Sequence, residues 1–350
     1  MPEPTLSRRF LLASAGAGLA LPAVAHAKHP KHRKSQLLNP LVLQRADPHI
    51  ARHTDDFYYM TATVPEYDRL VIRRATTLAG LASAPETVVW RRPTTGVMGG
   101  YIWAPELHHF DGAWHIYFGA GNADDLFHVR TFVLTCPDTN PLTGAWHVAG
   151  QIAMPWDSFN LDATTFVHAG QRYLCWAQHE PGIDTNSNLY LAPLKSPTEL
   201  GASPARLSVP TLDWQIIGYK VNEGPSILAR NGRLFLTYSA SATDEHYCLG
   251  MLTAKDDADI MNPASWSKSP QPVFKSSPAH NVWGPGHNGF TVDEAGRDML
   301  VYHARDYREI TGDSLFDPNR HTRVQPIHFG PDGVPDFGEP VAIGPLAWTP

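Results

Sequence analysis

The 350-residue sequence contains few cysteines and few charged residues, and these two features argue against a disulfide-stabilised fold and against a nucleic-acid-binding protein. Its three cysteines are an odd number for an exported protein, so we expect no disulfide framework, and Cys175 and Cys248 lie within apolar strand patterns that predict small core residues. Charged residues make up only 18% of the chain and the net charge is −6. This balance argues against a nucleic-acid partner.

Several catalytic signatures are missing as well. The sequence has no G-x-S-x-G around a serine, no P-loop and no H-E-x-x-H pair among its 18 histidines. The G-x-G-x-x-G match at residues 284–289 contains a proline and precedes a strand-like run, whereas a dinucleotide site needs a helix there. His108 and His109 would point to opposite faces of a strand and cannot form one metal site.

The one apolar run, near the N-terminus, is too short to span a membrane. Residues 1–27 combine the arginine pair Arg8 and Arg9 with this run and a small-x-small cleavage site that ends at Ala27. We interpret them as a twin-arginine export signal, which predicts a periplasmic or extracellular protein. Residues 28–40 are basic and contain prolines, so we expect a disordered spacer there.

What the sequence does contain is one strand pattern, repeated five times. Each copy is a polar or glycine turn followed by β-branched, aromatic and aliphatic residues. The copies are DDFYYMTAT from Asp55, DGAWHIYFGA from Asp111, GQRYLCWAQ from Gly170, NGRLFLTYSA from Asn231 and GRDMLVYHA from Gly296. Their spacing of roughly 60 residues leaves room for about four short strands per unit. We therefore predict an all-β fold, one five-bladed β-propeller over residues 41–350, rather than a β-sandwich or a parallel β-helix.

A second set of segments lies one strand before each of these turns. They are RADPHI, WAPEL, LDATTF, NEGPSI and GPGHNGF, and each carries a distinctive side chain three or four places before its last apolar residue: Asp47, Trp103, Asp162, Glu223 and His287. Because the first strand of every blade lines the axis of a propeller, equivalent positions converge. A single acid at such a place would be read as a turn residue. Three acids at one repeat position predict an axial active-site pocket.

Carboxylates in an aromatic-lined, weakly charged pocket suit glycoside hydrolysis. One acid must be protonated to assist the leaving oxygen, while another must be ionised. Like charges brought together push their pKa values apart, which gives two acids different roles at one pH. Acids on different blades could stand about 6.5–9.5 Å apart, with a water between base and sugar, as in inverting enzymes.

Taken together and in this order, the five segments resemble the blade motifs of glycoside hydrolase family 43, five-bladed propeller enzymes that act on arabinans and xylans. The resemblance runs from Leu41 to the C-terminus. It implies an inverting hydrolase in which Asp47 is the general base, Glu223 the general acid and Asp162 a third carboxylate that orients the acid and holds its pKa up. It also implies that His287 helps to hold a calcium ion through waters, although a lone histidine is more often structural. No organic cofactor is expected.

The segment from His303 to Ile327 is similar to the branch of the family with exo-acting α-L-arabinofuranosidases. This implies release of terminal arabinofuranose from 1,5-linked arabinan or arabino-oligosaccharides by a monomeric enzyme. An arginine would reach the sugar, with Arg323 as our choice and Arg320 as the alternative, and Trp103 would form an apolar wall. β-Xylosidase or endo-arabinanase activity of the same family remains open, as does a non-catalytic, secreted sugar-binding propeller, which would not need all three acids. An arabinoxylan-type polysaccharide is a further possible partner.

Overall fold

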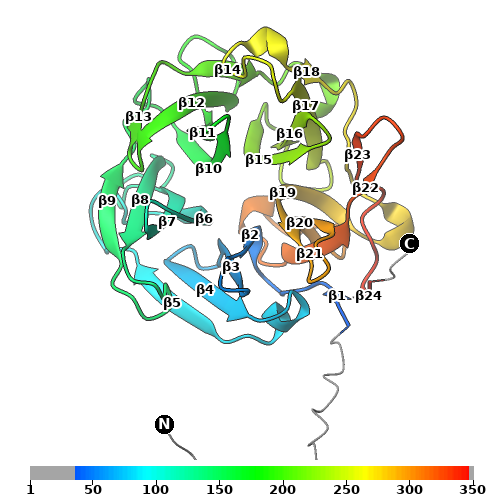
Figure 1. Cartoon of the computed structure of the whole chain (residues 1–350), viewed down its shortest axis with the longest axis horizontal. Helices are drawn as coiled ribbons and strands as arrows, with labels where there is room; N and C mark the ends of the chain where they lie inside the picture. Colours follow the sequence, from blue (N-terminus) through cyan, green and yellow to red (C-terminus); the bar gives the residue numbers. More distant parts are fainter. Residues whose placement is uncertain (1–35, 347–350) are drawn as a thin grey trace, which may run out of the picture. The chain divides into compact units, whose positions relative to one another are not determined.

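The computed structural model describes residues 36–346, whose strands form sheets arranged around one axis (Figure 1). Five of these sheets are blades in which consecutive strands pair antiparallel, and the first strand of each lies nearest the axis. The predicted five-bladed β-propeller is therefore confirmed. Within the described residues the only helices are short 3₁₀ turns, and none has the length and apolar character needed to cross a bilayer.

The blades follow one another in chain order. The first contains β2 (Ala46–Arg52), β3 (Tyr58–Thr63), β4 (Arg69–Ala75) and β5 (Glu86–Arg91), and the second contains β6 (Ile102–Phe110), β7 (Ala113–Ala120), β8 (Arg130–Cys136) and β9 (His147–Gln151). The third contains β10 (Asn160–His168), β11 (Gln171–Gln178) and β12 (Asn188–Ser196), with β13 (Glu199–Leu200) and β14 (Ala205–Ser208) both paired to β12. The fourth contains β15 (Asn222–Arg230), β16 (Arg233–Ala240), β17 (Cys248–Lys255) and β18 (Ser267–Lys268), and the fifth contains β19 (Trp283–Val292), β20 (Asp298–Arg305) and β21 (His321–Pro326).

Short elements complete the chain outside the blades. Two small sheets pair β1 (Leu38–Asn39) with β24 (Gly344–Pro345) and β22 (His328–Phe329) with β23 (Pro335–Asp336). The 3₁₀ turns are η1 (Ala79–Ala82), η2 (Asp213–Gln215), η3 (Pro263–Ser265), η4 (Pro278–His280) and η5 (Ser314–Phe316). All five lie between strands, so they shape loops rather than form a layer of their own.

Tight hairpins join the first two strands of the middle blades. They turn through the pairs Asp111–Gly112, Ala169–Gly170 and Asn231–Gly232, and both residues of each pair have positive φ. Two consecutive left-handed residues make the two-residue turn whose twist matches that of antiparallel strands. In these three blades, the polar or glycine turns that mark the sequence repeat are therefore two-residue hairpins.

The hydrophobic core lies between neighbouring blades, so each sheet is buried on both faces. Trp114 and Phe118 of the second blade pack with the first blade, and Trp176 of the third packs with the second. Three further clusters fill the remaining interfaces, including the one between the fifth blade and the first. Cys175 and Cys248 are buried with free thiols, as the strand pattern predicts.

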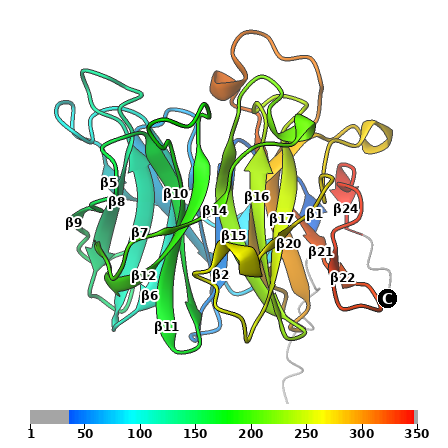
Figure 2. The ribbon, with the colours of Figure 1, turned by 90° about the horizontal axis from the view of Figure 1, so that it is seen from above.

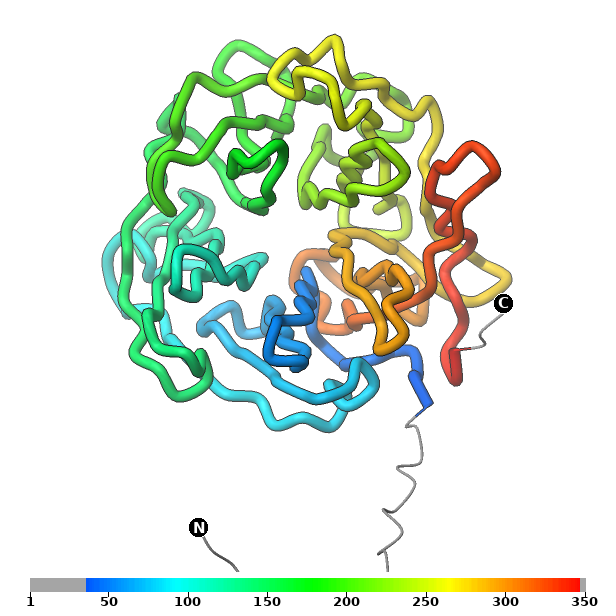
Figure 3. Tube along the Cα trace, viewed as in Figure 1, coloured from blue at the N-terminus to red at the C-terminus, as the bar shows by residue number. Residues whose placement is uncertain are grey.

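The ring is closed by residues that come before the first blade. Val42 exchanges backbone hydrogen bonds with Thr322 of β21, and the Asn39 side chain bonds both the N–H and the C=O of Val324. Figure 3 shows this N-terminal segment, in blue, beside the last blade. The predicted disordered spacer is therefore wrong for residues 36–40, because Leu37 and Asn39 are buried in this closure. The predicted export signal and residues 28–35 lie outside the described residues.

Candidate active site

Every inner strand carries a β-bulge in its first half, and these bulges build the site. In β2 the pairing register shifts between Ala46 and His49, and β6, β10, β15 and β19 have equivalent shifts. One residue in each bulge has a left-handed backbone, with φ between 43° and 57°: Asp47, Ala104, Asp162, Gly224 and His287. Non-glycine residues in this conformation are strained, and such strain is typical of functional sites.

The structure refines the repeat position that the sequence indicated. Asp47, Asp162 and His287 occupy the bulge itself, whereas Trp103 and Glu223 stand one residue before it. In the fourth blade the bulge residue is Gly224, and a Cβ there would lie 3.1 Å from the His287 ring. Both the positive φ and this close approach require glycine. The five predicted residues therefore come from two adjacent positions rather than from one.

A cavity of about 500 Å³ lies at one end of the axis, and Asp47, Trp103, Asp162, Glu223 and His287 all line it. Its outer walls come from loops that join strands within and between blades. Among them are Phe127 between β7 and β8, Tyr219 between β14 and β15, and Leu315 in η5. Figure 2 shows the loop that carries η5 projecting beyond the ends of the strands. A cavity of this volume suits a small, ring-shaped ligand.

Asp47 is surrounded by cationic and imidazole groups. Its Oδ1 lies 3.4 Å from His287 Nδ1, 3.3 Å from His303 Nδ1 and 3.8 Å from Arg320 Nη1. Its backbone N–H also donates to His303 Nδ1, at 3.0 Å. Burial alone would raise the pKa of Asp47, but His287 and Arg320 hold this pKa well below its usual range. Asp47 is therefore ionised at neutral pH.

The carboxyl groups of Asp162 and Glu223 have raised pKa values, in contrast to Asp47. Burial raises the pKa of Glu223 to about 7, with a further rise from the charge of Asp47, while a hydrogen bond from Tyr247 acts in the other direction. Burial and three neighbouring carboxylates, those of Glu223, Asp47 and Glu106, raise the pKa of Asp162 well above its usual range. The Asp162–Glu223 pair therefore retains a proton near neutral pH, while Asp47 does not. One cavity thus holds both a proton donor and a carboxylate base.

The arginine that reaches the cavity is Arg320, and this corrects our choice of Arg323. Arg323 is fully buried, pairs with Asp306 and donates to the carbonyl of Val341, so it does not line the cavity. Arg320 lines the cavity and donates to the hydroxyl of Tyr67 at 2.9 Å. β21 begins only at His321, so Arg320 belongs to the loop before the strand, while Arg323 lies within it.

Two aromatic residues of the site were not singled out by the sequence repeat. Tyr247, just before β17, lines the cavity and donates its hydroxyl to Glu223 Oε1 at 2.8 Å. His303 of β20 contacts the Asp47 backbone, as described above. Neither residue belongs to an inner strand, so the argument from converging first strands could not find them. His303 lies within the last copy of the repeated second-strand pattern, GRDMLVYHA, but nothing in that copy distinguishes it as a site residue.

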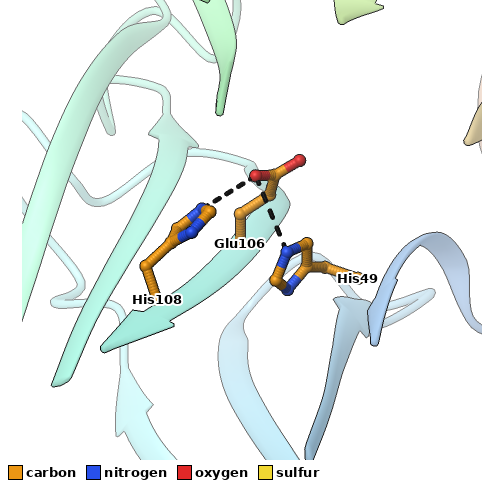
Figure 4. Close-up of side chains that lie close together, drawn as sticks. All are labelled: His49, Glu106 and His108. Carbon is orange, nitrogen blue, oxygen red and sulfur yellow. Dashed lines mark hydrogen bonds and ion pairs between the residues drawn. The ribbon is translucent and has the colours of Figure 1, made fainter. Parts of the chain in front are cut away.

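A polar cluster missed by the sequence analysis extends away from Asp47 along β2 and β6. Figure 4 shows Glu106 Oε2 facing His108 Nε2 at 2.9 Å and His49 Nε2 at 3.9 Å. Burial lowers the pKa of His49 to about 4 and that of His108 to about 3, so both rings are neutral at pH 7. Such a His–Glu–His group is a candidate metal centre by composition.

Hydrogen bonding argues against direct metal ligation by His49. Its Nδ1 accepts the backbone N–H of Leu107 at 3.3 Å, so the neutral ring carries its proton on Nε2. A protonated Nε2 has no lone pair to offer a metal ion. This nitrogen instead directs its N–H toward the Glu106 carboxylate. His108 and His109 do face different ways, as predicted: His108 is largely buried and His109 is exposed.

Glu106 is also the group that best fits a hard cation near the axis. Burial raises its pKa, and the compensating influences come from three other blades, through His49, a hydrogen bond from Thr164, and His287. Asn288, beside His287, is buried with neither side-chain amide atom hydrogen-bonded. Carboxylate, hydroxyl and amide oxygens are the ligands that Ca²⁺ prefers, so these residues fit a calcium ion.

Residues 37–335 match the family described as "Glycosyl hydrolases family 43". An "Extracellular exo-alpha-(1->5)-L-arabinofuranosidase" of Streptomyces avermitilis is 55% identical over 327 residues, which cover 93% of this chain and 68% of that protein. A protein of the same name from Streptomyces chartreusis is 56% identical over 308 residues, covering 88% of this chain and 94% of that protein. Among solved structures, an alpha-L-arabinofuranosidase from Lactobacillus brevis matches with a TM-score of 0.86 at 50% identity, over 88% of this chain and 98% of that one.

Proposed function

The chain belongs to glycoside hydrolase family 43, and from this membership we propose that it releases terminal α-L-arabinofuranose from 1,5-linked arabinan or arabino-oligosaccharides with inversion. The observation that carries the proposal is the pairing, in one cavity, of an ionised Asp47 with a Glu223 whose pKa is about 7. Hydrolysis of a glycoside needs these two protonation states at once. A sugar-binding protein would not.

In the proposed reaction Asp47 is the general base. Its carboxylate takes a proton from a water molecule, whose oxygen attacks the anomeric carbon of the terminal sugar. The positive charges and imidazole rings around Asp47 keep it ionised, so it is available as a base below neutral pH. His287 and Arg320, which lie within 4 Å of the carboxylate, also fix its position.

Glu223 is the proposed general acid. As the bond between the anomeric carbon and the glycosidic oxygen breaks, that oxygen takes the Glu223 proton and leaves as a neutral hydroxyl. Asp47 is then protonated and Glu223 ionised, and exchange of both with solvent restores the starting state. Asp162, fastened to the backbone N–H of Gly224, is the proposed third carboxylate that orients Glu223 and keeps its pKa high.

Arabinofuranose and exo action are proposed from the relatives and from the cavity. The relatives at 55% and 56% identity are named as exo-acting on 1,5-linked arabinofuranose. The loop around Leu315 forms part of the cavity wall, and the Tyr67 hydroxyl ties it to Arg320. A walled cavity favours the end of a chain over its middle. Trp103 and Arg320 are the proposed contacts to the terminal sugar, with Arg320 in place of Arg323.

Calcium is a further part of the proposal. Glu106, with Thr164 and His287, would hold the ion near the axis, where a divalent charge would stabilise the ionised Glu106 and join inner strands of different blades. No catalytic step depends on the ion. We also propose export by the twin-arginine signal of residues 1–27 and action as a monomer, which signal replacement in a secretion assay and light scattering would test.

The test is product analysis with 1,5-arabinotriose and p-nitrophenyl α-L-arabinofuranoside. We expect arabinose and arabinobiose as the first products of the trisaccharide, with inverted anomeric configuration in the earliest NMR spectra. Asp47→Asn should lose nearly all activity on both substrates, whereas Glu223→Gln should retain activity chiefly on the nitrophenyl glycoside, because nitrophenol leaves without full protonation. If the enzyme cleaved only xylosides, the assignment of arabinofuranose as the substrate sugar would be wrong. If both variants were folded and fully active, the assignment of Asp47 and Glu223 as catalytic residues would be wrong.

A further inference from the structure

Tyr247 stands directly against the proposed acid. It precedes β17, its side chain is almost completely buried, and its hydroxyl donates to Glu223 Oε1 at 2.8 Å. The inner strand β15 carries Glu223, so the contact joins the loop before the third strand of the fourth blade to that blade's first strand. A tyrosine placed in this way delivers one hydrogen-bond donor to one carboxyl oxygen.

The fold makes room for the Tyr247 ring and fixes its position. A Cβ on Gly286 would lie 2.2 Å from two carbons of the ring, so the glycine in β19 leaves the space that the ring occupies. The ring also stacks on His303, with centroids 5.7 Å apart and planes within 6° of parallel. Since His303 accepts the backbone N–H of Asp47, one rigid stack contacts both the proposed acid and the proposed base.

The charges around Tyr247 keep it protonated. Its surroundings include Glu223, Asp162 and Asp47 from three inner strands, with Ser239, Arg320 and His303 completing them. Burial and the carboxylates, Glu223 foremost, raise the pKa of Tyr247 well above its ordinary value. The hydroxyl therefore remains a donor at every pH at which the enzyme works.

A donor in this place acts most strongly when Glu223 is ionised. A hydrogen bond to a carboxylate is about twice as strong as one to a neutral carboxyl group. Glu223 becomes a carboxylate only as its proton passes to the leaving oxygen, so the bond from Tyr247 strengthens during the reaction. An interaction that is stronger in the transition state than in the ground state lowers the barrier.

We propose that Tyr247 is a positioning residue that fixes the Glu223 carboxyl group and stabilises the carboxylate formed as Glu223 protonates the leaving oxygen. The inference rests on the proposed role of Glu223 as the general acid. The proton that moves belongs to Glu223, and Tyr247 keeps its own throughout. Gly286 and His303 contribute by holding the Tyr247 ring.

The direct test is Tyr247→Phe, which keeps the ring and its stacking and removes only the hydroxyl. With arabinobiose as substrate we expect kcat to fall by about 10- to 100-fold with little change in KM. With p-nitrophenyl α-L-arabinofuranoside the fall should be much smaller, because that leaving group needs little protonation. Without its donor the Glu223 pKa rises, so the basic limb of the kcat/KM–pH profile should move to higher pH.

Tyr302→Phe is the matched control. Tyr302 is fully buried and its hydroxyl donates to Gln325 Oε1 at 2.9 Å, away from the cavity. Removing that hydroxyl should lower the unfolding temperature by a similar amount and leave both the leaving-group dependence and the basic limb unchanged. Gly286→Ala offers a second route, since the added methyl group displaces the Tyr247 ring while the hydroxyl is retained. We expect it to reproduce the kinetic signature of Tyr247→Phe.

The outcomes separate this inference from the proposed function. If Tyr247→Phe loses the same factor on both substrates and its basic limb does not move, Tyr247 is merely structural and the inference is overturned. If Glu223→Gln itself shows no dependence on the leaving group, the assignment of the acid fails first, and the role of Tyr247 fails with it. If the activity of Glu223→Gln depends on the leaving group but Tyr247→Phe behaves like the wild type, only the role of Tyr247 is rejected and the assignment of the acid stands.

Discussion

The carboxylate of Asp162 accepts a hydrogen bond from the backbone N–H of Gly224, at 2.9 Å, and is thereby fastened to the residue that follows Glu223. Two blades meet at this bond, because Asp162 lies in β10 and Gly224 in β15. The bond holds a second carboxyl group close to the proposed acid. We therefore expect Asp162 to affect both the position and the protonation of Glu223.

Replacing Asp162 with Asn should separate these two effects. Asn keeps an oxygen that can accept the Gly224 N–H, but it removes the like charge that helps Glu223 to hold its proton. The pKa of Glu223 should fall, and the basic limb of the kcat/KM–pH profile should move to lower pH by about one unit. A limb that stays in place, or moves upward, would contradict the role of Asp162. Asp56→Asn, which changes a highly exposed carboxylate, is the control and should leave the profile unchanged.

The acidic limb of the profile should respond to Arg320. The guanidinium of Arg320 helps to hold the pKa of Asp47 low, so Arg320→Met should raise that pKa. A base with a higher pKa is protonated at a higher pH, and the acidic limb should therefore shift upward. Arg323→Met removes a buried arginine that pairs outside the cavity, with Asp306. Arg323→Met should lower the unfolding temperature without moving the acidic limb of the profile. If both variants shifted this limb equally, the shift would not arise from the contact between Arg320 and Asp47.

The indole ring of Trp103 forms part of the cavity wall. The ring is mostly buried, stacks on Tyr101 with centroids 5.3 Å apart, and lines the cavity, while its Nε1 lacks a hydrogen bond. A sugar that packs against this ring would lose apolar contact area in Trp103→Phe, so we expect KM for arabinobiose to rise by about 3- to 10-fold with little effect on kcat. The Nε1 of Trp176 already donates to Gln178, outside the cavity, so Trp176→Phe should leave KM unchanged. An unchanged KM in Trp103→Phe would show that the substrate does not pack against the Trp103 ring.

Removal of calcium tests the proposed ion. Metal analysis of the purified protein should find about one Ca²⁺ per chain, and chelation should lower the unfolding temperature because the ion stabilises only the folded state. Glu106→Gln should reduce the calcium content. Asp244, Glu245 and His246 form another cluster of possible ligands, in a loop, so Asp244→Asn is the control and should not reduce it. If the purified protein contained no calcium and chelation did not change its unfolding temperature, the proposed calcium site would be wrong.

The features that recur in every blade were predictable from the sequence. The turn and strand pattern has a nearly constant period, so the number of blades follows from counting, and the inner strands follow from their place before each hairpin. Asp47, Asp162 and Glu223 could be brought together because a propeller directs all its first strands at one axis. The one-residue offset of Glu223 and Trp103 was not visible, because a β-bulge adds a residue without a sequence signal of its own.

The features that occur once were not predictable. Arg320 and Arg323 are three residues apart, and only the start of β21 at His321 decides which of them reaches the cavity. Tyr247 lies in a loop, where no periodicity indicates the direction of a side chain. The Glu-x-His spacing of Glu106 and His108 on one strand could have suggested a polar cluster, but His49 joins it only through the packing of β2 against β6.

The closure of the ring has a consequence for the order of events during synthesis. Asn39 and Val324 are bonded across a separation of 285 residues, so the first strand to leave the ribosome must wait for the last blade before its partner exists. Contacts between such distant residues form slowly, because most of the chain must be ordered first. A chain that stops before β21 would contain most of its blades and every proposed catalytic carboxylate. It would nevertheless remain an open arc, with the edges of its first and last sheets exposed to other chains.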